Sequence, residues 1–185
     1  DVPIGFFSIG WGGTSVSQWR SQVENGLFNR FRDVFDEVGG DGFRAVLWHQ
    51  GESDIGQKSA DEYAAQLSEV IEATRVEAGW DVLWGVARVG FAPMALQADM
   101  DAIVAGQQAV IDADPFVFEG PYTDDLIGEA WRYDGIHFNE AGLIEHAERW
   151  NARVELPPCA EVETCNGLDD DCDGRVDENF DLRID

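Results

Sequence analysis

The sequence has few basic residues. Of its 185 residues, 12 are Lys or Arg and 37 are Asp or Glu, which gives a formal net charge of −25, and Lys58 is the sole lysine. Nucleic-acid binding needs a basic patch that neutralises phosphates, so this composition argues against nucleic acid as a partner and disfavours anionic membranes. The sequence also lacks any run of about 18 apolar residues, and we therefore expect no membrane-spanning helix.

Cysteine is absent until late in the sequence. Cys159, Cys165 and Cys172 all lie in the last 27 residues. An odd number of cysteines in an acidic tail suggests one local disulfide and a partner outside this chain. Disulfides persist in oxidising compartments, so we expect a secreted, periplasmic or cell-surface protein. Three free thiols in a cytosolic tail are the alternative.

The apolar content is high enough for one folded domain. Hydrophobic residues make up 44% and aromatic residues 11% of the chain, which excludes a disordered polymer. Short apolar runs that predict strands alternate with helical patterns, and this alternation predicts an α/β fold with a parallel sheet covered on both faces. The expected strands are 2–9, 43–49, 82–89 and 116–118. The expected helices are 15–38, 60–78 (capped by Ser59, with Glu62 completing a capping box), 95–112 and 140–154 (capped by Asn139).

The pair Pro157-Pro158 predicts a domain boundary between residues 1–156 and 157–185. The second segment holds ten acidic residues and two arginines, with few large apolar groups. It cannot build a hydrophobic core, so it needs a metal or a disulfide to hold a shape.

A glycine turn, Gly10-Trp11-Gly12-Gly13-Thr14, follows the first expected strand and precedes a helix. Glycines let main-chain N–H groups approach a ligand closely, so Gly12 and Gly13 are candidate donors to an oxyanion. A tight strand-to-helix turn with no function is the alternative.

A polar block, Trp48-His49-Gln50-Gly51-Glu52-Ser53-Asp54, ends the second expected strand. Ligands of open α/β sheets bind beyond the carboxyl ends of strands. The Gln50 amide offers two N–H donors, and Glu52 can orient a neighbour or accept a proton. For His49 we expect only packing at the strand end.

The third candidate is Asp134-Gly135-Ile136-His137, just before the last helix. An Asp and a His three apart on a turn can pair, with the carboxylate holding Nδ1–H and leaving Nε2 as a base. The alternative is a helix-entry loop in which both side chains only satisfy the backbone. We expect His146, within the last helix, to be structural.

The three blocks, in this order, resemble the SGNH-hydrolase superfamily, and more closely its carbohydrate-esterase branch of the sialate O-acetylesterase and acetylxylan esterase type, over about residues 2–154. The resemblance implies a flavodoxin-like α/β/α sandwich that removes O-acetyl esters from sialic acid- or xylan-type sugars without a metal. It implies that Asp134 and His137 serve a serine nucleophile. Gly12 or Gly13 would donate to the oxyanion, Gln50 would be its side-chain donor, and Glu52 would support the same block.

One block of that family has no counterpart here. The family's nucleophile lies in an earlier Gly-x-Ser turn after a normally central first strand, and none of Ser8, Ser15, Ser17 or Ser53 matches it. The sequence starts at Asp1 with no signal peptide to read, so either one was removed or the chain is a piece of a longer one. We expect the second: the C-terminal portion of an esterase, catalytically incomplete as given and without its first strand.

The tail carries a separate pattern. Asp169, Asp171, Asp173 and Asp177 occupy positions 1, 3, 5 and 9 of a calcium loop of the EF-hand type, with Gly174 at position 6 and Phe180 where such loops place Glu. The segment also resembles Cys-Asn-Gly-x-Asp-Asp-Asp-Cys-Asp-Gly repeats of secreted bacterial proteins, described as metal-binding motifs. We expect calcium here and a Cys165–Cys172 disulfide; a solvated acidic tail is the alternative.

Three functions from different classes fit these patterns. The first is a secreted carbohydrate O-acetylesterase acting on an acetylated sugar, and an intact Gln50, Asp134 and His137 favours it. The second is a non-catalytic glycan-binding surface protein that has lost the nucleophile block. Four tryptophans would suit sugar stacking, although core packing is the alternative for most of them: Trp11, Trp48, Trp84 and Trp131. The third is a calcium-binding or adhesion tail on an inert scaffold.

Overall fold

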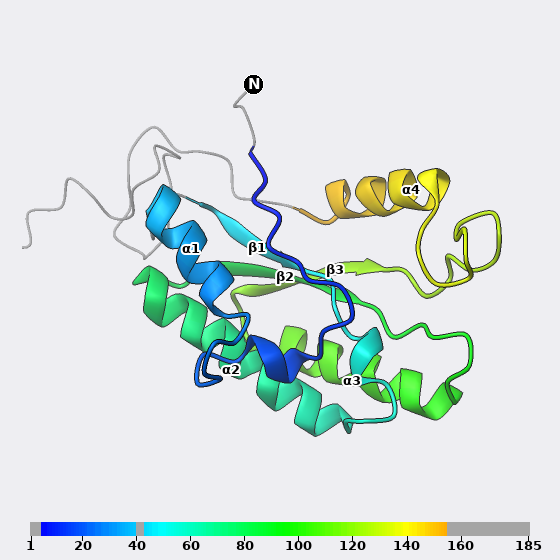
Figure 1. Cartoon of the computed structure of the whole chain (residues 1–185), viewed down its shortest axis with the longest axis horizontal. Helices are drawn as coiled ribbons and strands as arrows, with labels where there is room; N and C mark the ends of the chain where they lie inside the picture. Colours follow the sequence, from blue (N-terminus) through cyan, green and yellow to red (C-terminus); the bar gives the residue numbers. More distant parts are fainter. Residues whose placement is uncertain (1–4, 40–42, 155–185) are drawn as a thin grey trace, which may run out of the picture.

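A computed structural model of the protein describes residues 5–39 and 43–154. Three strands form one parallel sheet in the order β1-β2-β3, with helices on both faces, which confirms the predicted α/β class (Figure 1). The strands are β1 (Ala45–Trp48), β2 (Leu83–Arg88) and β3 (Val117–Tyr122). The helices are η1 (Val16–Trp19), α1 (Asn29–Val38), η2 (Glu52–Asp54), α2 (Ala60–Ala78), α3 (Gln97–Ala113) and α4 (Glu140–Asn151), where η denotes a 3-10 helix.

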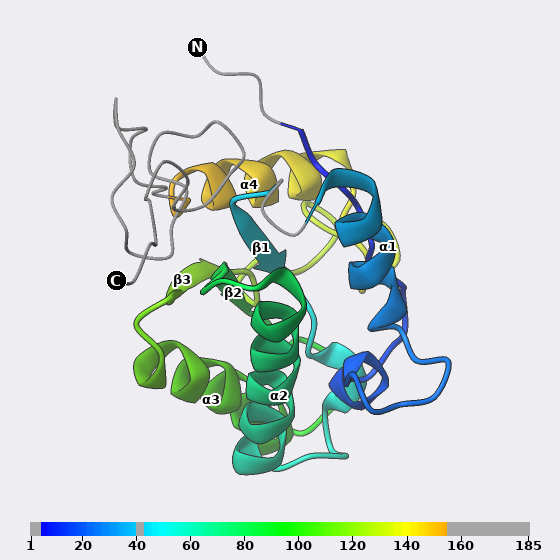
Figure 2. The same cartoon turned by 90° about the vertical axis from the view of Figure 1, so that its left-hand side faces the viewer.

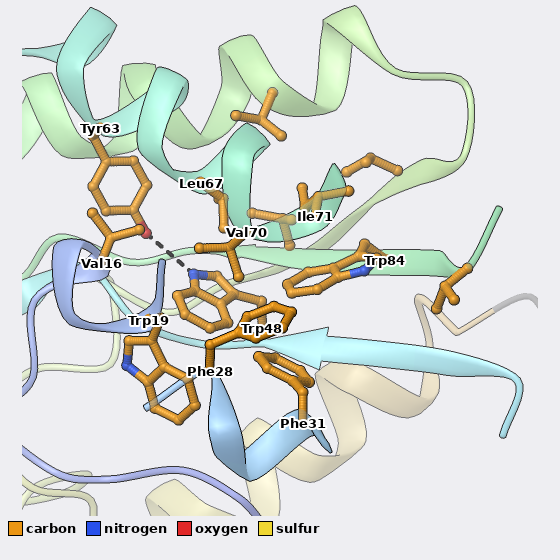
Figure 3. Close-up of a cluster of buried hydrophobic side chains, with 14 of the residues drawn as sticks. Val16, Trp19, Phe28, Phe31, Trp48, Tyr63, Leu67, Val70, Ile71 and Trp84 are labelled. Atoms are coloured by element: carbon orange, nitrogen blue, oxygen red, sulfur yellow. Dashed lines mark hydrogen bonds between the residues drawn. The ribbon is translucent and has the colours of Figure 1, made fainter. Parts of the chain in front are cut away.

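The helices form two unequal layers around the sheet. Helices α2 and α3 lie on one face, α4 lies on the other, and α1 flanks the β1 side (Figure 2). The main core lies under α2, where Trp48 and Trp84 project from the same face of neighbouring strands with ring centres 5.8 Å apart. Trp48 Nε1 donates to the Tyr63 hydroxyl at 3.3 Å within this core (Figure 3).

Two helices begin at the predicted capping residues. The Ser59 hydroxyl accepts from Glu62 N at 3.2 Å, and the Glu62 carboxylate accepts from Ser59 N at 2.9 Å, so the capping box before α2 is formed. The Asn139 side chain accepts from Gly142 N at 3.0 Å and starts α4. Local side-chain chemistry therefore fixes both helix starts.

Helix α4 approaches the sheet closely over two glycines. A Cβ on Gly85 would lie 3.0 Å from Trp150 and 2.5 Å from Phe118, and one on Gly120 would lie 2.7 Å from Trp150. Hydrogen in place of a side chain at these positions lets the Trp150 ring lie directly on β2 and β3.

The expected strand 2–9 does not form where the structure describes it. Residues 5–9 have no strand structure, and β1 is an edge strand of the described sheet. Phe6 is 81% exposed, and the Ile9 carbonyl accepts a side-chain hydrogen bond from Arg30 at 2.5 Å. An apolar run becomes a strand only with a partner strand and a buried face. Within the described ranges no strand pairs with residues 5–9, and among them only Ile9 packs against the core.

The expected helix 15–38 is interrupted, so that prediction was wrong in its extent. It divides into η1 and α1, joined by turns. Asn25 has a φ of 55°, a left-handed conformation that ends a right-handed helix. The residues at the predicted apolar positions nevertheless face the core, where we find Trp19, Phe31 and Phe35.

Candidate active site

Two of the three sequence blocks follow strands of the sheet. Gln50 and Glu52 follow β1, while Asp134 and His137 lie between β3 and α4. The glycine turn follows no described strand, and it contacts the Gln50 loop through Thr14. Two contacts join the blocks. Gln50 Nε2 donates to Thr14 O at 2.8 Å, and Phe138 packs edge-on against His49 with ring centres 6.5 Å apart.

Asp54 joins the glycine turn to the Gln50 loop. Its side chain is 0% exposed. One carboxylate oxygen accepts from Val16 N at 2.9 Å and from Gln50 Nε2 at 2.7 Å, and the other accepts from the Ser15 hydroxyl. No role was predicted for Asp54, because its partners lie 38 and 39 residues earlier in the chain and no local pattern marks such a pairing.

Gln50 is held on both sides of its amide. Its Nε2 donates to Thr14 O and to Asp54, so both N–H groups are engaged. The Tyr63 hydroxyl lies 2.6 Å from Gln50 O, to which it donates, and 3.1 Å from Oε1. Burial raises the pKa of Tyr63 well above its ordinary value, so this hydroxyl keeps its proton. The role of Gln50 as an oxyanion donor stays a prediction, and it requires one N–H group to change partner.

The glycine turn presents main-chain donors. Gly12 and Gly13 are exposed, and Gly13 has a φ of 74°, which favours glycine. Within residues 5–39 and 43–154, neither amide N–H has a hydrogen-bond partner. Both are therefore available to a ligand, as an oxyanion donor must be.

Asp134 and His137 form the pair expected from their spacing. His137 Nδ1 lies 2.7 Å from Asp134 Oδ2, and Asp134 Oδ1 accepts from His137 N at 2.7 Å and from Ile136 N at 2.9 Å. The hydrogen bond from the His137 side chain, helped by these two amides, lowers the pKa of Asp134 to about 2. At neutral pH the carboxylate is charged and holds Nδ1–H, which leaves Nε2 as the basic nitrogen.

Glu52 faces a pair of histidines. Its Oε1 lies 3.8 Å from His49 Nε2, and His49 Nδ1 lies 3.1 Å from His146 Nε2, which also accepts from Trp150 Nε1 at 3.0 Å. Burial, followed by the charge of His49, lowers the pKa of His146 to about 4. His146 is therefore neutral near pH 7, and its Nε2 accepts from Trp150. Burial acts to raise the pKa of Glu52, but the contact with His49 and the main-chain amides of Gly51 and Glu52 together outweigh it and hold that pKa below its ordinary value.

Asp124 is a polar residue of this edge that the sequence analysis missed. It follows β3 and accepts from Gly90 N at 3.0 Å and Phe91 N at 3.1 Å, so it ties the loop after β2 to the loop after β3. Burial raises its pKa, and the charge of Glu52 adds to that effect. Its position at a strand end was the available signal.

Several predictions lie outside the described residues. These are the calcium loop with Asp169, Asp171, Asp173 and Asp177, the Cys165–Cys172 pair, and Cys159. Within the described ranges, no three His, Cys, Asp or Glu side chains are grouped so that they could hold a metal ion. No helix in these ranges is long and apolar enough to cross a membrane.

Comparison with known proteins gives one family. The sequence pattern of the family described as carbohydrate esterase, sialic acid-specific acetylesterase, matches residues 1–154. Searches of curated proteins and of solved structures found no match to the chain.

Proposed function

The chain belongs to the carbohydrate esterase family of sialic acid-specific acetylesterases, and we propose that its site removes O-acetyl esters from a sialic acid- or xylan-type sugar. The observation that carries the proposal is the Asp134–His137 pair, with Nδ1 and Oδ2 2.7 Å apart and the carboxylate fixed by two main-chain amides. This is the arrangement of a general base and its orienting group.

The proposed reaction is acyl transfer through a serine. His137 Nε2 takes the proton of a serine hydroxyl as its oxygen attacks the acetyl carbonyl. The bond to the sugar oxygen breaks as His137 returns that proton to the sugar, and water then releases acetate from the acetyl-serine by the same steps. Asp134, ionised at neutral pH, stabilises the imidazolium, and the Gly12 and Gly13 amides stabilise the oxyanion.

The serine is not among the described contacts of His137. The Ser15 hydroxyl is bound to Asp54, and Ser17 lies 2.9 Å from Ser15. The proposal therefore assigns the base, its orienting group and oxyanion donors to this chain, and it leaves the identity of the nucleophile to experiment.

Acetate release tests the proposal. We expect the protein, as produced from its own gene, to release acetate from acetylated xylooligosaccharides or 9-O-acetylated sialic acid, and His137→Ala to remove nearly all turnover. Gln50→Ala should lower turnover by roughly a hundredfold, the usual size for one oxyanion donor. Leu143→Ala, on the exposed face of α4, is the matched control. Undiminished turnover in His137→Ala would refute His137 as the base.

A non-catalytic glycan-binding protein is the second candidate. It is favoured by Trp11, which is 60% exposed with the Arg30 guanidinium 5.2 Å from its ring centre, and by Tyr133, which is 70% exposed. Exposed aromatic faces suit sugar stacking. Sugar binding without acetate release, lost on Trp11→Ala, would select this function.

For the tail we propose a calcium site in a secreted, periplasmic or cell-surface protein. The alternating carboxylates of Asp169, Asp171, Asp173 and Asp177 support it. Isothermal titration with calcium should show one site that Asp171→Ala removes. No heat of binding would mean that the loop is an acidic spacer.

A further inference from the structure

The Asp134–His137 pair lies at the tip of the turn formed by residues 131–139. Main-chain hydrogen bonds close its base, from Asn139 N to Trp131 O at 2.8 Å and from Tyr133 N to His137 O at 3.1 Å. The tip itself faces solvent, since the His137 side chain is 66% exposed and that of Asp134 is 39% exposed. Burial of these two side chains does not hold the tip in place.

Arg132 lies at the base of this turn and is 5% exposed. Its Nε donates to Leu126 O at 2.6 Å, one Nη donates to Ile136 O, and the other reaches Thr123 O at 3.5 Å. All three acceptors are main-chain carbonyls. Two belong to the loop after β3, and the third belongs to the residue directly before His137.

Two aromatic rings enclose the guanidinium. Its central carbon lies 4.8 Å from the ring centre of Phe91 and 4.4 Å from that of Phe138. Phe91 comes from the loop after β2, whereas Phe138 and the three carbonyls belong to the connection between β3 and α4, so one side chain joins two loops at the carboxyl edge of the sheet. The charges of Glu52, Asp124 and Asp134 act on the same group. A buried cation among three carboxylates also offsets their mutual repulsion.

We propose that Arg132 is a positioning residue of the Asp134–His137 pair: its guanidinium fixes Ile136 O against the loop after β3 and so sets where the turn carries the imidazole, on which the Tyr133 ring stacks with ring centres 5.8 Å apart. The catalytic importance of this placement rests on the proposed function, whereas the placement itself does not. Lysine at this position would keep the charge but lose the planar guanidinium, whose N–H groups donate to the Leu126 and Ile136 carbonyls in different directions.

The test compares two conservative variants by NMR. We expect Arg132→Lys to remain folded, with its tryptophan-core resonances retained, and to lose the low-field Nδ1 proton signal of the His137–Asp134 hydrogen bond. The matched control is Arg75→Lys. Arg75 is also largely buried and joins two loops, donating to Val82 O at 3.2 Å and to Asp114 at 2.5 Å, at the opposite edge of the sheet. This control should keep the signal.

An unchanged Nδ1 signal in folded Arg132→Lys, or loss of the signal in both variants, would overturn the proposal. A measurement on the unsubstituted protein covers the case in which Arg132→Lys does not fold. The Arg132 Nε proton should then exchange with solvent far more slowly than that of Arg153, whose side chain is 46% exposed. Equal exchange rates would overturn the proposal. Neither of these two measurements requires turnover. A protein that releases no acetate would therefore refute the proposed function and leave the structural role of Arg132 unaffected.

Discussion

The two halves of the candidate site are held by different forces. The half that contains the glycine turn and Gln50 is tied to the core by Asp54, Tyr63 and Gln107, each of which is fully buried. The half that contains Asp134 and His137 is an exposed turn, held by its own main-chain hydrogen bonds and by Arg132. Changes to the buried residues of the first half should therefore lower the stability of the fold, whereas changes to the exposed side chains of Asp134 and His137 should affect the chemistry with little effect on stability.

The largest expected loss of stability comes from Asp54. Asp54→Ala leaves Val16 N, Gln50 Nε2 and the Ser15 hydroxyl without their acceptor in a buried place, and we expect a loss of about 3 kcal/mol or more in the free energy of unfolding. Urea unfolding measures it. Asp54→Asn keeps the shape and one acceptor oxygen, so it should cost less. A loss below about 1 kcal/mol for the alanine variant would mean that the Asp54 carboxylate does not hold the glycine turn and the Gln50 loop in place.

Gln107 should give the next largest effect. Its side chain accepts from Val89 N at 2.8 Å and donates to Val89 O at 2.8 Å and Gln50 O at 3.1 Å. Gln107→Leu fills similar space but leaves Val89 N and Val89 O unpaired, while Gln50 O keeps the Tyr63 hydroxyl, and the change should cost about 2 kcal/mol. The matched control is Gln108→Leu, which removes only an exposed hydrogen bond to Asp112. If thermal unfolding showed the same loss of stability for both variants, the claim that Gln107 stabilises this half of the site would be contradicted.

His146, whose partner His49 directly precedes Gln50, should make stability depend on pH. Its pKa is about 4 in the folded protein against an ordinary value of 6.5. Between these values the unfolded chain binds a proton that the folded chain does not, so stability rises with pH through this window and falls on acidification. After allowance for partial exposure, we expect about 1 kcal/mol between pH 6.5 and 4. Between pH 6.5 and 4, acidification should lower the free energy of unfolding of the protein more than that of His146→Phe, as measured with urea. An equal loss in both forms would be evidence against a neutral His146.

The smallest effect on stability should come from the turn itself. His137→Ala should change the free energy of unfolding by less than about 0.5 kcal/mol, because the side chain is exposed. The same variant should raise the pKa of Asp134 from about 2 while leaving it below its ordinary 3.8, since the two main-chain donors remain. Carboxyl-carbon NMR titration measures this shift. An unchanged pKa of Asp134 would show that the two side chains do not interact.

Most of the features that were predicted correctly depend on local sequence patterns. The Ser59 capping box, the Asn139 cap and the Asp134–His137 pair each depend on residues within three positions of one another, so the sequence displays them directly. The alternation of strands and helices likewise predicted the parallel sheet, because each period reflects which faces are buried.

The features that sequence reasoning missed depend on distant partners. Residues 5–9 have the composition of a strand but pair with no strand of the described sheet, and Asn25 breaks a helix whose apolar spacing is otherwise regular. Asp54 and Gln107 acquire their roles through contacts made 38 and 57 residues away. His49 and His146, expected only to pack, meet across 97 residues to form a polar pair facing Glu52.

The most direct test is the reaction of the protein with a fluorophosphonate, which labels activated serines, followed by peptide mass spectrometry. The account predicts one labelled serine in the protein and loss of that label in His137→Ala, with the unfolding midpoint unchanged. A protein without a labelled serine, or with equal labelling in both forms, would contradict the claim that His137 is the base of a serine esterase.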